Sequence, residues 1–328
     1  MNHTSKYPKT MACALLMATA LGLSGLAHAQ AESYPSKAVR LVNNFPPGGP
    51  SDTLARAVQP VLQELLRQSV IVENKAGAAG NVGASEVARA PADGHTVLFG
   101  IDSTFTVNPH IYKTMPFKTT DFKPVIIMAS SGLLVGVHPS TGIKTMQELL
   151  GVGKNKMLNF SSGGNGSPGH LAVEMFKDEA KLKINHIPYR GNTPAVTALV
   201  AGEVDGGNLA TPGMLPHVLT GKITALAVTS AQRSRLLPDL PTVSELGLKS
   251  FEQEVLYLVM VPAATSDSVV ALLQKGIMEA LKRPNVERRL NSLDLNFEGL
   301  TGVAASKRLS EASARYAKII QATGMTPE

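Results

Sequence analysis

Short apolar runs alternate along this chain with longer stretches in which apolar residues return every three or four positions. The run at 38–42 is typical of a strand, and the helical spacing after it includes Leu54, Val58 and Val61. Further apolar runs predict strands at 69–73, 96–100, 124–129, 133–137, 157–160, 184–189, 223–229 and 251–261. Helical spacing returns at 269–281 and 304–322. This alternation predicts an α/β fold with helix-covered sheets.

The loop between the first strand and the first helix is rich in proline and glycine. It runs from Phe45 to Asp52 with the sequence FPPGGPSD. Such a turn leaves its backbone open to a ligand. Ser51 or Asp52 is expected to cap the helix. Because the first N–H groups of a helix have no intrahelical partner and carry partial positive charge, this loop predicts a binding site for a small anion.

A second segment, 157–180, repeats this order. An apolar strand leads into a polar, glycine-rich loop, and a helix is expected to begin at His170. The strand at 96–100 ends beside two further hydroxyl donors, Ser103 and Thr104. Ligands of parallel sheets bind at the carboxyl ends of the strands. We therefore expect the two loops to face each other across a cleft.

The N-terminus has the pattern of an export signal. Lys6 and Lys9 precede an apolar stretch at 11–26, and Ala27-His28-Ala29 fits a signal-peptidase site. We expect residues 1–29 to be a secretory signal peptide, cleaved after Ala29; the alternative left open is a retained N-terminal anchor. The stretch is short for a membrane span. The chain's one cysteine, Cys13, lies inside it, so we expect no disulfide and no cysteine metal site in the mature chain.

Charge and composition indicate which classes of ligand the protein could bind. The formal net charge is +6, and loss of Lys6 and Lys9 would leave +4 (6 − 2). Lysine and arginine are scattered, tryptophan is absent and aromatic residues are few. This pattern argues against a nucleic-acid surface. A mild positive excess would help to attract an anionic small molecule.

Motifs for enzymes and cofactors are weak. Gly77, Gly80 and Gly83 follow a strand with GxxGxxG spacing, whereas a dinucleotide site needs GxGxxG. The sequence has no GxxxxGK[ST] phosphate loop, and its histidines have no metal-ligand spacing. The segment 166–169 resembles a nucleophile elbow in composition but not in spacing. We expect no cofactor and no metal, and keep a hydrolase as a minor alternative.

At this point the residues resemble a known family. Over nearly its whole mature length the chain is similar to the periplasmic solute-binding proteins of tripartite tricarboxylate transporters, the Bug or TctC family. No single motif carries the resemblance, which rests on the order and spacing of many. They are FPPGGPSD (45–52), VENKAGAAGNVGA (72–84), APADGHTVLFG (90–100), NPHIY (108–112), SSGGNGSPGH (161–170), IPYRGNTPA (187–195), AGEVD (201–205), LAVTSAQRS (226–234) and LPDLPTVSELG (237–247).

The resemblance implies a two-lobed periplasmic binding protein of type II-like α/β fold, with a parallel or mixed sheet in each lobe. Lobe 1 would comprise residues 30–131 and 254–328, and lobe 2 residues 132–253. A small mono- or dicarboxylate would be held in the cleft by backbone N–H groups and water, then passed to a membrane permease by a monomeric periplasmic protein. Matched position by position, the ligand-binding residues would be Phe45, Gly48, Gly49, Ser51, Asp52, Ser103, Thr104, Ser161, Ser162, Gly166, Ser167 and His170.

Two positions depart from the family pattern. Leu256 stands where an aromatic residue is common, and Leu209 lies near a position that is often acidic. Some members could use that acid to meet a ligand's ammonium group. Its absence favours a plain mono- or dicarboxylate over an amino acid.

Several alternatives stay open at this stage. Asp52 is better suited to fixing its loop than to meeting an anion, because a bare carboxylate would repel the ligand. His170 is as well suited to bonding the loop backbone as to binding ligand, and ligand binding would make the affinity pH-dependent. The protein as a whole could instead present its closed form to a sensor kinase, or act as an enzyme on this fold.

Overall fold

The structure is a computed structural model that describes Met1 and residues 34–248 and 251–326. The predicted signal peptide and its cleavage site lie outside the described residues. Contacts divide the chain into two units, 1–36 and 37–328, and the second holds all the helices and strands discussed below. Among the described residues, no helix is long and apolar enough to span a bilayer.

Ten strands form the framework of residues 37–328, and the predicted α/β class is confirmed. The sheet path is β2-β1-β3-β9-β4-β7-β5-β6, with β8 and β10 also paired to β4. The strands are β1 (Val39–Asn43), β2 (Val70–Asn74), β3 (Thr96–Ile101), β4 (Phe122–Val137), β5 (Leu158–Ser162), β6 (Ile184–Pro188), β7 (Gly206–Ala210), β8 (Thr224–Val228), β9 (Glu254–Pro262) and β10 (Asn296–Leu300).

Helices follow most strands. The α-helices are α2 (Pro50–Leu66), α3 (Asn81–Ala88), α4 (Ser103–Thr106), α5 (Asn108–Ile111), α6 (Met146–Asn155), α7 (Pro168–Glu179), α8 (Asn192–Ala201), α9 (Thr211–Leu219), α10 (Asp267–Leu281), α11 (Pro284–Ser292) and α12 (Gly302–Thr323). Short 3₁₀ turns lie at η1 (Ala78–Gly80), η2 (Thr119–Asp121) and η3 (Pro139–Thr141). Parallel pairing of β1 with β2 and β3, and of β5 with β6 and β7, matches the predicted alternation.

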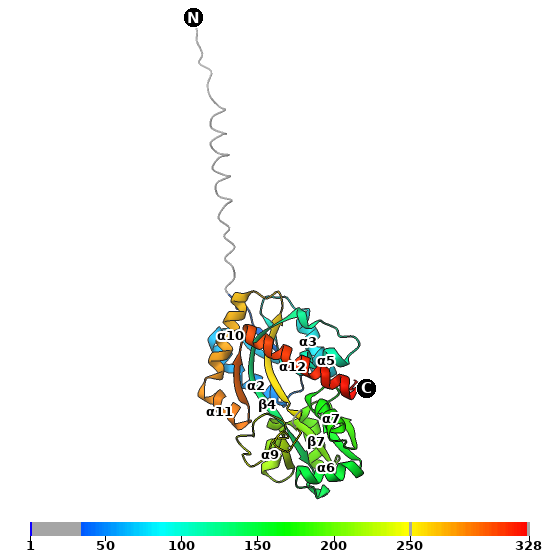
Figure 1. Ribbon diagram of the computed structural model, residues 1–328. Coiled ribbons are helices and arrows are strands. Elements are labelled where there is room, and N and C mark those ends of the chain that lie inside the picture. The colour runs from blue at the N-terminus through cyan, green and yellow to red at the C-terminus, as the bar shows by residue number, and fades with distance from the viewer. Residues whose placement is uncertain (2–33, 249–250, 327–328) are drawn as a thin grey trace. The chain divides into compact units, whose positions relative to one another are not determined.

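Strand β4 joins two sheet regions. Its residues 122–132 pair with β9, and residues 133–137 pair with β7. We call β1, β2, β3, β9, β10 and the first part of β4 the first sheet region, and β5 to β8 with the last part of β4 the second. In Figure 1 β4 runs between α2, α10, α11 and α12 at one end and α6, α7 and α9 at the other.

The sequence prediction of two separate strands, 124–129 and 133–137, was wrong. The small polar residues between them suggested a break, but the strand continues through them. Ser130 and Ser131 are buried there, and their hydroxyls bond Glu298 Oε1 at 2.7 Å and Tyr257 Oη at 3.2 Å. Tertiary partners therefore satisfy polar groups that a solvent-exposed loop would have left to water.

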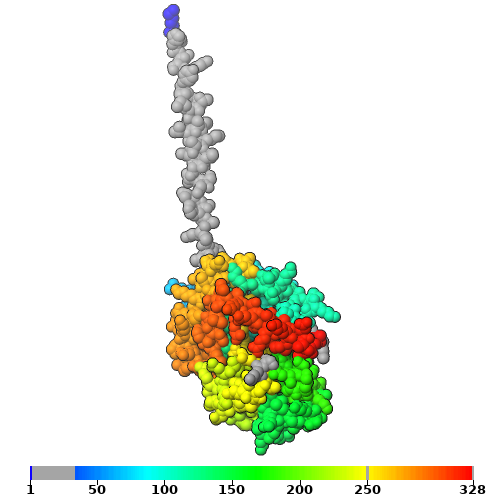
Figure 2. Space-filling model, in the orientation of Figure 1, coloured from blue at the N-terminus to red at the C-terminus, as the bar shows by residue number. Residues whose placement is uncertain are grey.

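Each sheet region has its own apolar core. In the first, Val42, Leu98 and Leu258 pack with an edge-to-face aromatic cluster in which the Phe105 and Phe122 ring centroids are 5.1 Å apart. The second core consists of Leu134, Ala195, Val196, Leu199, Val204, Leu209, Met214, Ile223 and Val228. The C-terminal helix α12 packs on β4 and also contacts α7 of the second region. In Figure 2 α12, in red, lies on the surface beside the green residues of the second region.

Candidate functional site

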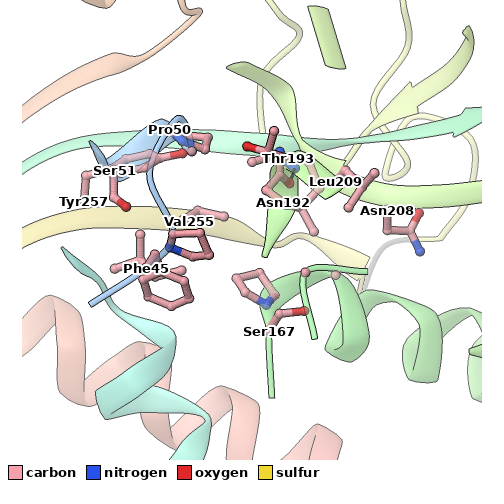
Figure 3. Close-up of a pocket in the computed structure, with 18 residues that line it drawn as sticks. Phe45, Pro50, Ser51, Ser167, Asn192, Thr193, Asn208, Leu209, Val255 and Tyr257 are labelled. Atoms are coloured by element: carbon pink, nitrogen blue, oxygen red, sulfur yellow. Dashed lines mark hydrogen bonds between the residues drawn. The ribbon is translucent and has the colours of Figure 1, made fainter. Parts of the chain in front are cut away.

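One cavity lies where the two predicted loops meet. Its wall includes Phe45, Gly49 and Ser51 from the first loop and Ser167 and Gly169 from the second, and its volume is about 570 Å³ including the open mouth. Figure 3 shows Pro50 and Ser51 on one side and Ser167, Asn192 and Thr193 on the other. The structure thus brings both strand–loop–helix units to a single site.

The first side of the cavity is the start of α2. Gly49, in an extended conformation, is the residue that precedes the helix, and Pro50 is its first residue. The prediction that Ser51 or Asp52 caps the helix was wrong, because proline suits the first helical position and starts the helix earlier. The N–H of Ser51 belongs to the first turn, which lacks intrahelical acceptors and carries partial positive charge.

Asp52 stabilises this loop from behind. Its side chain is 4 % exposed and does not line the cavity. Oδ2 accepts the Gly48 N–H at 2.9 Å, Oδ1 accepts the amide of Asn74 at 2.9 Å, and Arg56 adds an ion pair at 3.0 Å. Burial alone would raise the pKa of Asp52, but these hydrogen bonds outweigh it and hold the pKa below its ordinary value. Asp52 therefore fixes the loop.

Replacing Asp52 with alanine is expected to weaken the binding of a small anion at the cavity at least tenfold and to lower the free energy of unfolding by about 2–4 kcal/mol, because several charge-assisted hydrogen bonds are lost. Arg56→Ala is the matched control, since it removes the half-exposed partner of the same carboxylate together with one exposed bond to Asn74 Oδ1. The Arg56→Ala variant should lower the free energy of unfolding by less than about 1 kcal/mol. Calorimetric titration and urea unfolding measure both effects. Unchanged affinity in Asp52→Ala would show that the loop holds its shape without this carboxylate.

The second side is the start of α7. The helix begins at Pro168, two residues before the predicted His170, and Ser167 Oγ caps it by accepting the His170 N–H at 3.2 Å. The His170 side chain faces the loop: its Nδ1 accepts the Gly166 N–H at 3.2 Å. Its ring stacks on His186, with centroids 4.1 Å apart and planes 3° from parallel. The histidine pair thus supports the glycine-rich loop.

Both histidines are held neutral. Burial, followed by electrostatic interaction with His186 and with Lys177, lowers the pKa of His170 to about 3. Burial and Lys177 lower the pKa of His186 to about 4. The His186 ring nitrogen Nε2 lies 2.6 Å from Ser162 Oγ. Neutral rings can accept these hydrogen bonds, whereas protonated rings cannot.

The predicted site residues divide into two groups. Phe45, Gly49, Ser51 and Ser167 line the cavity. The others lie outside its wall: Gly48, Asp52, Ser103, Thr104, Ser161, Ser162, Gly166 and His170. Most of these make hydrogen bonds within the protein; Thr104 Oγ1, for example, accepts from Asn44 and donates to the Ala79 carbonyl at 3.2 Å. Those of the first and second loops shape these loops rather than the cavity surface, and Ser103 and Thr104 lie in α4.

A third helix start contributes to the wall and was not predicted as part of the site. Gly191 precedes α8, and Asn192 and Thr193 of its first turn line the cavity. The Asn192 carbonyl Oδ1 accepts the Ala210 N–H at 3.0 Å, which ties α8 to β7. The sequence Gly-Asn-Thr-Pro has the same glycine-then-proline order as the other two loops, and that signal could have found it.

The rest of the wall is apolar. It includes Ile101, Leu133, Leu209, Val255 and the ring of Tyr257. Burial raises the pKa of Tyr257, so its hydroxyl is neutral. Asn208 also contributes, and neither of its buried side-chain amide atoms has a partner in the described part of the chain. A bound ligand or water commonly satisfies such a group.

The chemistry of this site is that of a binding cavity for a small anion. Three helix starts supply N–H groups and partial positive charge. In the described residues no cluster of histidine, cysteine or carboxylate side chains could hold a metal ion. No aspartate, glutamate, lysine, arginine or histidine is among the residues described as lining the cavity.

Comparisons with known proteins agree with this geometry. Residues 54–325 match the family model "Tripartite tricarboxylate transporter family receptor". Protein BugT of Bordetella pertussis is 31 % identical over 303 residues, which cover 90 % of this chain and 91 % of BugT. The structure of R. palustris Rpa4515 with adipate is 30 % identical, with a TM-score of 0.86, and covers 90 % of this chain and all of that one.

A further solved structure, MatC from Rhodopseudomonas palustris with bound malate, is 26 % identical with a TM-score of 0.82 and covers 88 % of this chain and all of that one. These likenesses confirm the expected two-lobed fold and the family resemblance. The chain therefore belongs to the tripartite tricarboxylate transporter receptor (Bug/TctC) family, whose members are periplasmic solute-binding proteins.

Proposed function

We propose that this protein captures a small organic carboxylate in the cavity and delivers it to the membrane subunits of a tripartite tricarboxylate transporter. The observation that carries the proposal is the meeting of three helix starts at one cavity whose described wall has no charged side chain. Solved relatives hold adipate and malate, both carboxylates. The proposal includes export to the periplasm with cleavage after Ala29, and action as a monomer.

Backbone donors are sufficient for useful affinity. A hydrogen bond to a charged group contributes roughly 1.5–3 kcal/mol, and about 8 kcal/mol corresponds to micromolar binding. A few such bonds from the starts of α2, α7 and α8 therefore suffice without a buried lysine or arginine. Apolar contacts with the wall would add to this.

We further propose that the two lobes, 30–131 with 254–328 and 132–253, close around the ligand. The bends would lie in 129–137 and 252–261, segments that belong largely to β4 and β9. Because a ligand between α2 and α7 touches both lobes, it stabilises the closed form over the open one. A permease would then recognise the closed form.

The test is a thermal-shift screen of residues 30–328 against organic acids and amino acids, followed by X-ray scattering with the best ligand. Ligand that binds only the folded state raises Tm by mass action. We expect a clear rise with one class of carboxylate and a smaller radius of gyration at saturation. Absence of any shift across the panel would refute the carboxylate receptor. A shift with unchanged scattering would refute closure alone.

A further inference from the structure

The hydrogen-bond donors of the cavity lie on one part of its wall, and apolar side chains form another part. The helix starts supply N–H groups from Ser51 and from the first turns of α7 and α8. Ile101, Leu133, Leu209 and Val255, from β3, β4, β7 and β9, form apolar wall. A ligand whose carboxylate meets the helix starts must therefore place most of its remaining atoms against hydrocarbon, with Asn208 as the one amide side chain of that part of the described wall.

A second carboxylate would find no charged side chain on that wall, whose polar side chains outside the helix starts are Asn208 and Tyr257 among the described lining residues. The only described side chain of the wall that titrates is Tyr257, whose hydroxyl lies 3.2 Å from Ser131 Oγ and is buried. Arg190 lines an adjoining cavity, which shares Phe45, Pro46 and Gly163 with this one. Burying an anion without a partner costs far more than its contacts return. The hydrocarbon part of the wall thus selects against a second charge.

We propose that the protein is selective for monocarboxylates with an apolar body, and that it discriminates against dicarboxylates of the same length. This inference rests on the proposed function, because it assigns the selectivity of the same cavity. It sets this chain apart from relatives seen with adipate and malate. The apolar body lies against Leu133, Leu209 and Val255.

Hexanoate and adipate provide a matched pair, since they share six carbons and differ by one carboxylate. Isothermal titration of residues 30–328 is expected to give a Kd for hexanoate at least tenfold lower than for adipate. From butanoate to hexanoate each added methylene should lower the Kd about fourfold, as expected for its burial. Hexanoate binding should also show a negative heat-capacity change.

The outcomes separate this inference from the proposed function. If adipate or malate binds as tightly as hexanoate or more tightly, the selectivity is refuted while the carboxylate receptor stands. If an amino acid binds and no plain carboxylate does, or if no acid of the panel binds, the function itself is refuted and the selectivity with it.

A variant tests where the apolar body lies. Val255→Thr keeps the shape of a fully buried wall residue and adds a hydroxyl, so it is expected to weaken hexanoate binding about fivefold or more. Val303→Thr, at an exposed position on α12, is the matched control and should leave the Kd unchanged. Equal Kd values for Val255→Thr and the parent chain, with both folded by their melting curves, would refute the placement.

Discussion

Replacing Gly169 with alanine is expected to remove most carboxylate binding and to lower the free energy of unfolding by about 2–3 kcal/mol. A Cβ at this position would lie 2.3 Å from the backbone carbonyl oxygen of Asn208 and 3.1 Å from the Cβ of Ser162. Backbone of β7 cannot move aside as a flexible side chain can, so the start of α7 must shift. That shift would displace the N–H groups beside the cavity, and we expect at least a tenfold rise in Kd.

Gly151→Ala is the matched control for this prediction. Gly151 lies inside α6 of the same sheet region, and a Cβ there would meet nothing within 4 Å. Alanine in a helix interior is more favourable than glycine by about 0.5–1 kcal/mol, so this variant should gain stability. Urea unfolding and calorimetric titration of both variants measure the contrast. Parent-like affinity in Gly169→Ala would mean that the start of α7 does not bind the ligand.

Acidification to about pH 5 is expected to destabilise the protein through the stacked pair His170 and His186. Both folded-state pKa values, about 3 and about 4, lie below the ordinary 6.5. Below pH 6.5 these two histidines therefore take up protons in the unfolded chain but not in the folded chain. The contribution of the two histidines to the free energy of unfolding is fully present above pH 6.5. It decreases as the pH falls toward their folded-state pKa values, by about 2 kcal/mol for each histidine at about pH 5.

Other groups also respond in this range. Asp102, whose pKa burial raises to about 6, acts in the opposite direction, since its folded form takes up a proton first; we expect about 1 kcal/mol of compensation between pH 7 and pH 5. Glu174 Oε1 lies 3.8 Å from His170 Nε2, but Lys177 engages the same oxygen at 2.9 Å. These groups contribute equally to the parent and to a histidine variant, so comparing the two proteins cancels their effect on the pH dependence.

The decisive measurement is therefore the slope of unfolding free energy against pH in His186→Asn. This variant should be less stable than the parent at about pH 7, because the stack and the Ser162 contact are lost, yet its slope should be flatter. His110→Asn is the comparator, since partial burial lowers the pKa of His110 while its ring bonds Ser313 instead of the pair. It should change the slope less. A parent-like slope in His186→Asn would refute the role of the pair.

Local sequence patterns predicted the elements that carry the cavity. The loop at 45–52 and the helix after it were recognisable because proline, glycine and spaced apolar residues all indicated the same turn. The α12 helix, predicted at 304–322, is confirmed at Gly302–Thr323. In contrast, β10 was missed, since Asn296-Phe297-Glu298-Gly299-Leu300 is largely exposed and contains no apolar run. Its strand conformation depends on β4, which the local pattern does not contain.

Which site residues line the cavity and which support the loops behind it was less predictable. Asp52, Ser162 and His170 lie in the right loops, but nothing local tells whether a side chain faces the cavity or the loop behind it. The wall residues Leu133, Leu209 and Val255 come from three strands widely separated in the chain. Their meeting depends on sheet order, and so on pairings that sequence periodicity does not specify.

The long strand β4 and its partner β9 also determine the order in which this chain can fold. Leu98 in β3 pairs with Met260 in β9, so the first sheet region stays incomplete until the last quarter of the chain is present. The second region lies within one segment, 133–228, and can assemble earlier. During synthesis β3 therefore has an unpaired edge while the second region matures, and such edges invite aggregation. A chain truncated before β9 would keep that edge of β3 unpaired permanently. Productive folding of the first sheet region therefore requires the C-terminal quarter of the chain.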